Sequence, residues 1–392
     1  MMKISIKDLL LTLIFSFLVL GAICYILSLS PPNATWRSRY LFSLYGVSVF
    51  SVIYLFQNAR VMRLRIPAFL AFFVFYEYVV SSANSMLKFF KMLSDTCAWP
   101  LVFLVFYEYS TKRELPRHFK HVAICGYGAI AALSVPIVLS NGTLRIEGVF
   151  ATFFCFTFLP VVYLVASKRV GVVCSALTAL LMLLSLKRSA FIITTVGVAL
   201  YYFLSGSNEN NGRKKLRKRA AFFMMVVCAC FVGMYVIEKF NVNIISRLAS
   251  ISEDGGSGRT KIWNIVLQEY NRSPFLQKMF GHGFQAVYYN VKPSGISRFA
   301  HNSYLETLYD YGGIGLLLVI ILQIVIIISF FKMLKKKHRL APVLGYSIVP
   351  MLVLSFVSYF YEQSVLIVPL CVVWGVCLGT YKREKQAIAD RW

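Results

Sequence analysis

The stretch from Arg298 to Glu306 (RFAHNSYLE) holds the side chains of this sequence that are best suited to acid–base chemistry. It contains an imidazole at His301 and an amide at Asn302, directly before an apolar run from Gly312 to Phe331. A run of about 20 apolar residues is long enough to cross a membrane as a helix. We therefore interpret this stretch as the reactive edge of a membrane enzyme.

Two residues of this stretch have a structural explanation. Ser303 and Glu306 fit an S-x-x-E capping box, in which each side chain accepts a hydrogen bond from a backbone N–H at the start of a helix. The pattern predicts Ser303 as the N-cap of the helix that follows, and it favours a structural role for Glu306 over a catalytic one.

The capping box does not explain His301. A helix N-terminus disfavours the charged form of an imidazole, and a neutral imidazole can act as a base. A lone histidine at a junction between loop and helix is also often structural. The residues alone leave both roles open.

Composition identifies the class of protein that carries these residues. The chain has 392 residues, 58% of them hydrophobic, and its mean hydropathy is +0.68. The apolar residues form long blocks rather than the periodic stripes of a soluble domain. We predict an all-α polytopic membrane protein with about 12 transmembrane helices, at residues 9–29, 40–57, 66–80, 96–109, 122–139, 149–166, 170–186, 190–204, 220–237, 303–331, 341–356 and 365–380.

The charge pattern predicts the topology. The formal net charge is +25, and most Lys and Arg residues fall in alternate loops on the side of the N-terminus. This is the pattern of the positive-inside rule, so both termini are expected in the cytoplasm and nucleic acid is not the expected partner. His118, His121 and His338 then lie in basic cytoplasmic loops, as solvated bystanders.

The same topology places one large loop outside, and it divides the chain into three parts. Residues 1–237 hold transmembrane helices 1–9, residues 238–302 form the large loop, and residues 303–392 hold helices 10–12 and a cytoplasmic tail. Within the loop, residues 259–270 (RTKIWNIVLQEY) have the apolar spacing of an amphipathic helix, and Gly281-His282-Gly283 predicts a tight turn.

Basic residues on the outer side suggest an anionic ligand. Lys187 and Arg188 interrupt two apolar runs there, either to reach lipid headgroups or to turn a guanidinium toward a phosphate. Arg259, Arg272 and Arg298 add to this charge, and His282 is the other histidine on the outer side. Together they fit a lipid-linked phosphate or pyrophosphate better than a neutral solute.

Motifs for other chemistries are absent from the sequence. It has no P-loop, no dinucleotide fingerprint, no H-E-x-x-H and no Asp-x-Asp metal motif, and its nine cysteines include no CxxC pair. We predict no cofactor, no metal site and no disulfide framework.

The ordered set Ser-Gly-Arg259-x3-Trp263, Gly281-His-Gly283-Phe, Ala-His301-Asn302-Ser-Tyr-Leu-Glu306 and Gly312-Gly-Ile-Gly315, with Lys187-Arg188-Ser189 before it, resembles the O-antigen ligase/polymerase family. The resemblance covers roughly residues 186–331. It implies a C-type glycosyltransferase of the bacterial inner membrane, with a periplasmic active site. The donor would be an undecaprenyl-pyrophosphate-linked oligosaccharide, and the acceptor a glycan or a lipid A-core.

The resemblance also implies residue roles. Arg188 and Arg259 would bind the donor pyrophosphate, and His301 would be the catalytic base. Arg298, Asn302, Lys187, Arg272 and His282 are accessory candidates. Membrane lipids and a chain-length regulator are the further partners implied.

Two activities occur in this family, a polymerase that joins repeat units and a ligase that transfers finished glycan. The residues around 281–305 resemble polysaccharide polymerases more closely, so we favour the polymerase. A flippase of lipid-linked glycan and a solute transporter are the remaining alternatives, although a transporter would be expected to show inverted repeats, and the sequence shows no matching halves.

Overall fold

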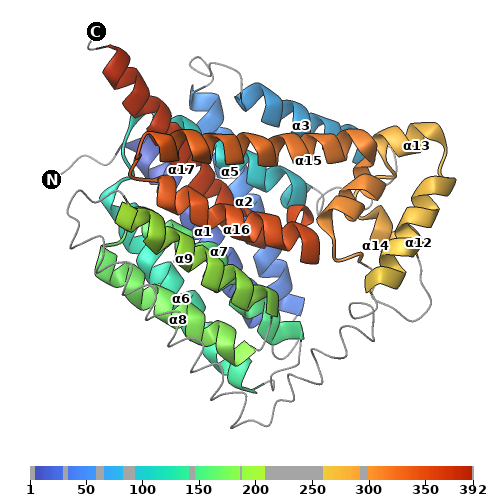
Figure 1. Cartoon of the computed structure of the whole chain (residues 1–392), viewed down its shortest axis with the longest axis horizontal. Coiled ribbons are helices and arrows are strands. Elements are labelled where there is room, and N and C mark those ends of the chain that lie inside the picture. Colours follow the sequence, from blue (N-terminus) through green and yellow to red (C-terminus); the bar gives the residue numbers. More distant parts are fainter. Residues whose placement is uncertain are drawn as a thin grey trace.

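The computed structural model describes residues 5–29, 34–58, 66–82, 93–140, 146–185, 188–207, 259–291 and 299–390. This part of the chain is built from helices (Figure 1). They are α1 (Ile6–Leu27), α2 (Ala34–Asn58), α3 (Ile66–Ser82), a π-helix (Leu93–Cys97), α5 (Ala98–Lys112), α6 (Arg117–Ser140), α7 (Ile146–Val165), α8 (Lys168–Ser185), α9 (Arg188–Ser207), α12 (Arg259–Arg272), α13 (Phe275–Phe280), α14 (Ala286–Asn290), α15 (Ser303–Lys335), α16 (Ala341–Val357), a 3-10 turn (Phe360–Glu362) and α17 (Ser364–Ala389).

The helices confirm a polytopic membrane protein. Five of them, in α1, α2, α6, α15 and α17, are long and apolar enough to cross a membrane, and shorter apolar helices lie within α3, α7, α9 and α16. The helix predicted at residues 220–237 lies outside the described residues, as do Lys187 and Arg298. The count of 12 spans therefore stays a prediction.

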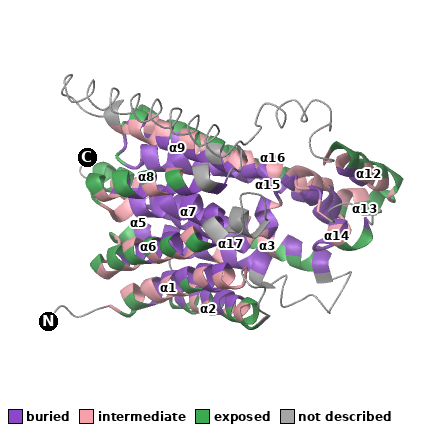
Figure 2. Ribbon diagram, turned by 90° about the horizontal axis from the view of Figure 1, so that it is seen from below, coloured by how far each residue is buried: buried purple, intermediate pink, exposed green. Residues whose placement is uncertain are grey.

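Helix α17 forms the centre of the bundle, and 94% of the residues in its apolar segment are buried within the protein. Glycines let it approach α5 closely. A Cβ atom on Gly379 would lie 2.5 Å from the carbonyl oxygen of Tyr107, and one on Gly375 would lie 2.8 Å from that of Phe103. Figure 2 shows the buried residues running through the middle of the bundle and many exposed ones on α12 and α13.

Helices α12, α13 and α14 form a small unit at the end of the bundle where α15 begins (Figure 1). The start of α1 and the end of α17 lie at the opposite end. The predicted amphipathic helix is confirmed as α12, whose Ile262 and Val266 are buried in a cluster with Val287 and Ala300. The predicted turn at residues 281–283 is also confirmed, with positive φ angles at both glycines.

Two glycines hold this unit against α15. Gly312 interrupts α15 with a φ of +70°, and Gly281 ends α13 with a φ of +87°. A Cβ atom on Gly312 would lie 2.3 Å from the carbonyl oxygen of Met279, and one on Gly281 would lie 2.2 Å from that of Asp310. The backbone N–H of Gly283 donates to the Asp310 carbonyl at 2.8 Å. The two backbones therefore touch directly, which requires glycine at both positions.

Candidate functional site

The helix that follows His301 begins at Ser303, as predicted, but its N-cap is not the predicted residue. Asn302 is the N-cap of α15, because its Oδ1 accepts hydrogen bonds from the backbone N–H of Tyr304 at 3.0 Å and of Leu305 at 3.3 Å. The prediction of Ser303 as N-cap is therefore wrong. Asn is as good an N-cap as Ser, and with Asn302 in this role the hydroxyl of Ser303 can bond to other partners.

Ser303 instead joins α15 to the connection between α16 and α17. Its Oγ donates to the carbonyl oxygen of Ser358 at 2.9 Å and accepts from the backbone N–H of Phe360 at 2.7 Å. Both partners lie more than 50 residues away in the sequence, so no local pattern indicates them. The bonds hold residues 358–360 beside the start of α15.

Glu306 has a structural role, but its partners differ from those of the predicted capping box. The side chain is 2% exposed, and its Oε1 accepts from the backbone N–H of His301 at 3.1 Å. The backbone of Ala300 also donates to this carboxylate. His301 itself has a φ of +51°, a left-handed conformation in which histidine occurs more often than most residues. Glu306 thus holds the turn that presents the imidazole.

Replacing Glu306 by alanine is expected to destabilise the protein by about 1–3 kcal/mol, because it leaves buried N–H groups without an acceptor. The measurement is the thermal denaturation midpoint of the purified protein in detergent. Glu306→Gln keeps an oxygen acceptor and should lie much closer to the wild type. Equal midpoints for the alanine variant and the wild type would contradict this role.

An aromatic cluster lies beside the imidazole. The ring centroid of His301 lies 5.8 Å from that of Tyr359, and the Tyr359 ring stacks on Phe299 at 4.2 Å with 5° between the planes. The Tyr288 ring of α14 packs against Phe299 at 4.7 Å. The cluster therefore joins α14, the segment before α15 and the connection before α17.

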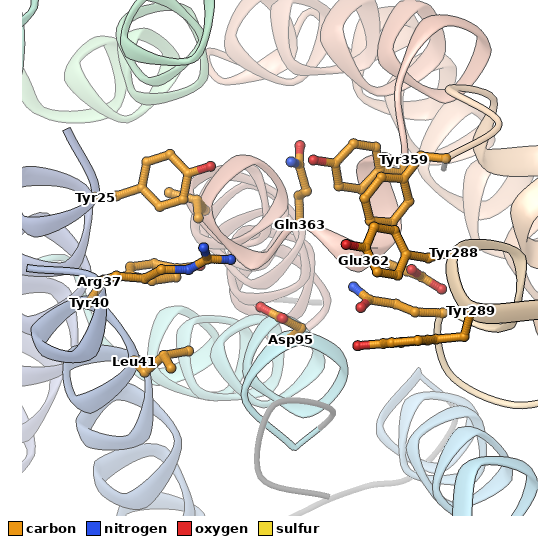
Figure 3. A pocket seen from close by; sticks show the side chains of 13 residues that line it. Tyr25, Arg37, Tyr40, Leu41, Asp95, Tyr288, Tyr289, Tyr359, Glu362 and Gln363 are labelled. Atoms are coloured by element: carbon orange, nitrogen blue, oxygen red, sulfur yellow. The ribbon is translucent and has the colours of Figure 1, made fainter. Parts of the chain in front are cut away.

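The same rings line a cavity of about 350 Å³, which lies within the range of about 300–1,000 Å³ for small-molecule pockets. Figure 3 shows Arg37 reaching from one wall toward the middle, with Tyr288, Tyr289 and Tyr359 on the opposite side. The lining residues are Tyr25, Arg37, Tyr40, Leu41, Asp95, Gln285, Tyr288, Tyr289, Phe299, Tyr359, Glu362, Gln363 and Val365. His301 is not among the lining residues, but its ring contacts that of Tyr359.

Buried carboxyl groups lie near the cavity, and one of them, Glu362, lines it. Asp310 is 1% exposed, and its Oδ1 accepts from the backbone N–H of Val287 at 2.8 Å. Asp310 also lies close enough to Glu362 for electrostatic interaction. Glu306 lies close enough to Glu362 for electrostatic interaction, so the three groups form one carboxyl cluster.

Arg259 is the first residue of α12 and is partly buried, and this burial lowers the pKa of its guanidinium. One turn further along, Trp263 Nε1 donates to the carbonyl oxygen of Ala300 at 2.8 Å. This bond fixes α12 to the residue next to His301. The structure therefore brings the helix of Arg259 and the segment of His301 together.

The other predicted site residues have different surroundings. Arg188 begins α9, and its side chain lies outside the described residues. Arg272 ends α12 on the surface, paired with Glu269 at 3.0 Å. His282 stacks on Tyr309 with ring centroids 4.1 Å apart, and its ring nitrogens contact Ser273 Oγ and the Tyr309 carbonyl. These contacts give His282 a place in the docking of α13 on α15.

The sequence analysis does not identify several residues of the site. Tyr359 and Glu362 belong to a polar and aromatic run, residues 358–363 (SYFYEQ), between two predicted outer span ends, and that position is a usable signal. Arg37 and Asp95 are isolated charges near predicted spans, and no local pattern connects them with His301.

Comparison with known families agrees with the resemblance drawn from the sequence. Residues 173–320 match the family model described as O-antigen ligase. This range includes Arg188, Arg259 and His301, and it excludes Arg37, Asp95 and the residues of the connection before α17. No curated protein matches the chain.

Proposed function

Because residues 173–320 match the O-antigen ligase family, whose members are glycosyltransferase-like enzymes, we propose that this protein transfers a glycan from undecaprenyl pyrophosphate to an acceptor hydroxyl. The reaction is placed at the periplasmic face of the inner membrane, with both termini in the cytoplasm. The observation that carries the proposal is the position of His301, held by Glu306 in a left-handed turn beside an aromatic-lined cavity. That turn stands where an apolar helix begins, so a substrate with a lipid tail can reach it.

In the proposed mechanism, His301 takes the proton of the acceptor hydroxyl as its oxygen attacks the anomeric carbon. The bond between that carbon and the pyrophosphate oxygen breaks, and negative charge develops on the leaving group. Arg188 and Arg259 stabilise this charge, because a guanidinium binds phosphate oxygens in a bidentate manner. Positioned guanidinium groups are most effective where water is excluded.

Between the two activities of the family, we propose the polymerase. Its support is the resemblance of residues 281–305 to polysaccharide polymerases. The two activities share the donor chemistry and differ in the acceptor, so the product distinguishes them. An O-antigen ligase is the second candidate.

The test uses cells that lack the chromosomal copy and carry the gene on a plasmid. The wild-type protein should restore long surface glycan, and Arg259→Lys should restore little of it, because an ammonium group does not replace the bidentate guanidinium. Arg169→Lys, at an exposed position on α8, is the matched control and should behave as wild type.

The glycan that accumulates without the protein identifies the activity. Single repeat units on the acceptor indicate a lost polymerase, whereas long chains left on the carrier lipid indicate a lost ligase. Surface glycan of unchanged amount and length in these cells would refute the proposed function.

A further inference from the structure

We propose that the cavity between α2 and α14 is a subsite for an uncharged sugar of the acceptor glycan. The assignment to the acceptor rests on the proposed function, whereas the assignment to a sugar rests on the lining of the cavity. Its volume of about 350 Å³ suits a mono- or disaccharide unit.

The first argument is the aromatic content of the wall. Six of the lining residues are aromatic, namely Tyr25, Tyr40, Tyr288, Tyr289, Phe299 and Tyr359. Aromatic rings offer a large apolar face at low conformational cost, and tyrosine adds a hydroxyl for hydrogen bonding. A sugar ring has the matching surface, with apolar C–H faces and a rim of hydroxyl groups.

The polar groups of the cavity are arranged around the same space. Arg37, Asp95 and Gln363 point into it from three different elements (Figure 3). Asp95 is oriented by Ser364, whose Oγ lies 3.3 Å from Asp95 Oδ1 and donates to the Asp95 backbone carbonyl at 3.0 Å. Carboxylate and guanidinium groups can each bind a pair of neighbouring hydroxyl groups, so such a set is typical of sugar recognition.

The charges argue against the donor pyrophosphate as the occupant. Among the lining residues that the structure describes, Asp95 and Glu362 are acidic and Arg37 is basic. A pyrophosphate here would face the carboxyl groups of Asp95 and Glu362, and these disfavour an anion across the binding site. An uncharged sugar has no such penalty, and Arg259, one of the two arginines proposed for the pyrophosphate, is not among the described residues that line this cavity.

The position of His301 argues for the acceptor. Its ring centroid lies 5.8 Å from that of Tyr359 and 6.5 Å from that of Phe299, and both rings line the cavity. The cavity and the imidazole therefore share two aromatic rings. An acceptor glycan held in this cavity can extend past these rings to the imidazole, which would take the proton of its hydroxyl.

The experiment measures sugar binding directly. The full-length protein in lipid nanodiscs is titrated with oligosaccharide repeat units that mild acid releases from the surface glycan of the source strain. Tyr288→Leu is expected to weaken binding about tenfold, because it removes an aromatic face and a hydroxyl. Phe275→Leu, on the exposed side of α13, is the matched control and should bind as the wild type does. Inorganic pyrophosphate should not compete with the oligosaccharide.

A second measurement needs no variant. The oligosaccharide should slow hydrogen–deuterium exchange of the wild-type protein in residues 285–291 and 359–363. Competition by pyrophosphate, binding unchanged in Tyr288→Leu, or a lack of protection in these segments would each overturn the inference. Because binding is read without transfer, these failures are separate from that of the proposed function, which is judged by the glycan products.

Discussion

A His301→Asn variant is expected to transfer glycan about 10²–10⁴-fold more slowly than the wild type, which is the usual contribution of a general base. Asparagine is chosen because it tolerates the left-handed backbone conformation that His301 adopts. The substitution therefore removes the imidazole and retains the turn. The measurement is the initial rate of transfer by the purified protein with a lipid-linked oligosaccharide donor.

The matched control for this variant is His121→Asn, at an exposed position on α6. It should retain the wild-type rate. The thermal denaturation midpoint of His301→Asn should also stay close to that of the wild type, which separates a catalytic loss from misfolding. A transfer rate within twofold of the wild type would remove His301 from the role of base.

The second large effect is expected from Gly312→Ala. A Cβ atom at this position would lie 2.3 Å from the Met279 carbonyl oxygen, and the residue would keep a φ of +70° that alanine disfavours. We expect a loss of about 2–5 kcal/mol, from the backbone strain and the overpacking together. Because α13 docks on α15 at this point, the loss should appear both as a lower denaturation midpoint and as faster proteolysis within residues 259–291.

The neighbouring glycine provides the control. A Cβ atom on Gly313 would meet the Lys278 carbonyl oxygen at 3.7 Å, an ordinary contact, and its φ is not positive. Gly313→Ala should therefore be close to neutral. Similar midpoints for the two variants would mean that the contact between α13 and α15 does not depend on the close approach at Gly312.

Much of the fold follows from local sequence. Blocks of apolar residues predict helices that cross a membrane, because a bilayer requires both a minimum length and internally satisfied backbone hydrogen bonds. The apolar spacing of residues 259–270 predicts α12, because every third or fourth side chain of a helix faces the same way. The glycines at positions 281 and 283 predict the turn between α13 and α14.

The capping of α15 shows where local patterns stop. Asn302 and Ser303 are both good N-caps, and the choice between them depends on Ser358 and Phe360, which accept and donate the hydrogen bonds of the Ser303 hydroxyl. A pattern of four residues contains no information about such distant partners. A structural role for Glu306 was predictable because its partners are local, although they are the backbone N–H groups of residues 300 and 301 rather than that of Ser303.

The candidate site also has one part that local sequence indicates and another that only the tertiary structure shows. Local sequence indicates His301, because this histidine stands at the edge of an apolar helix and is not needed to cap that helix. Only the tertiary structure brings Arg37, Asp95 and Tyr359 into one cavity beside it. Hydrophobic periodicity indicates which face of each helix meets the membrane or the core. This pattern is set by residues within a few turns of one another. A cavity wall is decided by which helix ends meet, and those contacts join residues hundreds of positions apart.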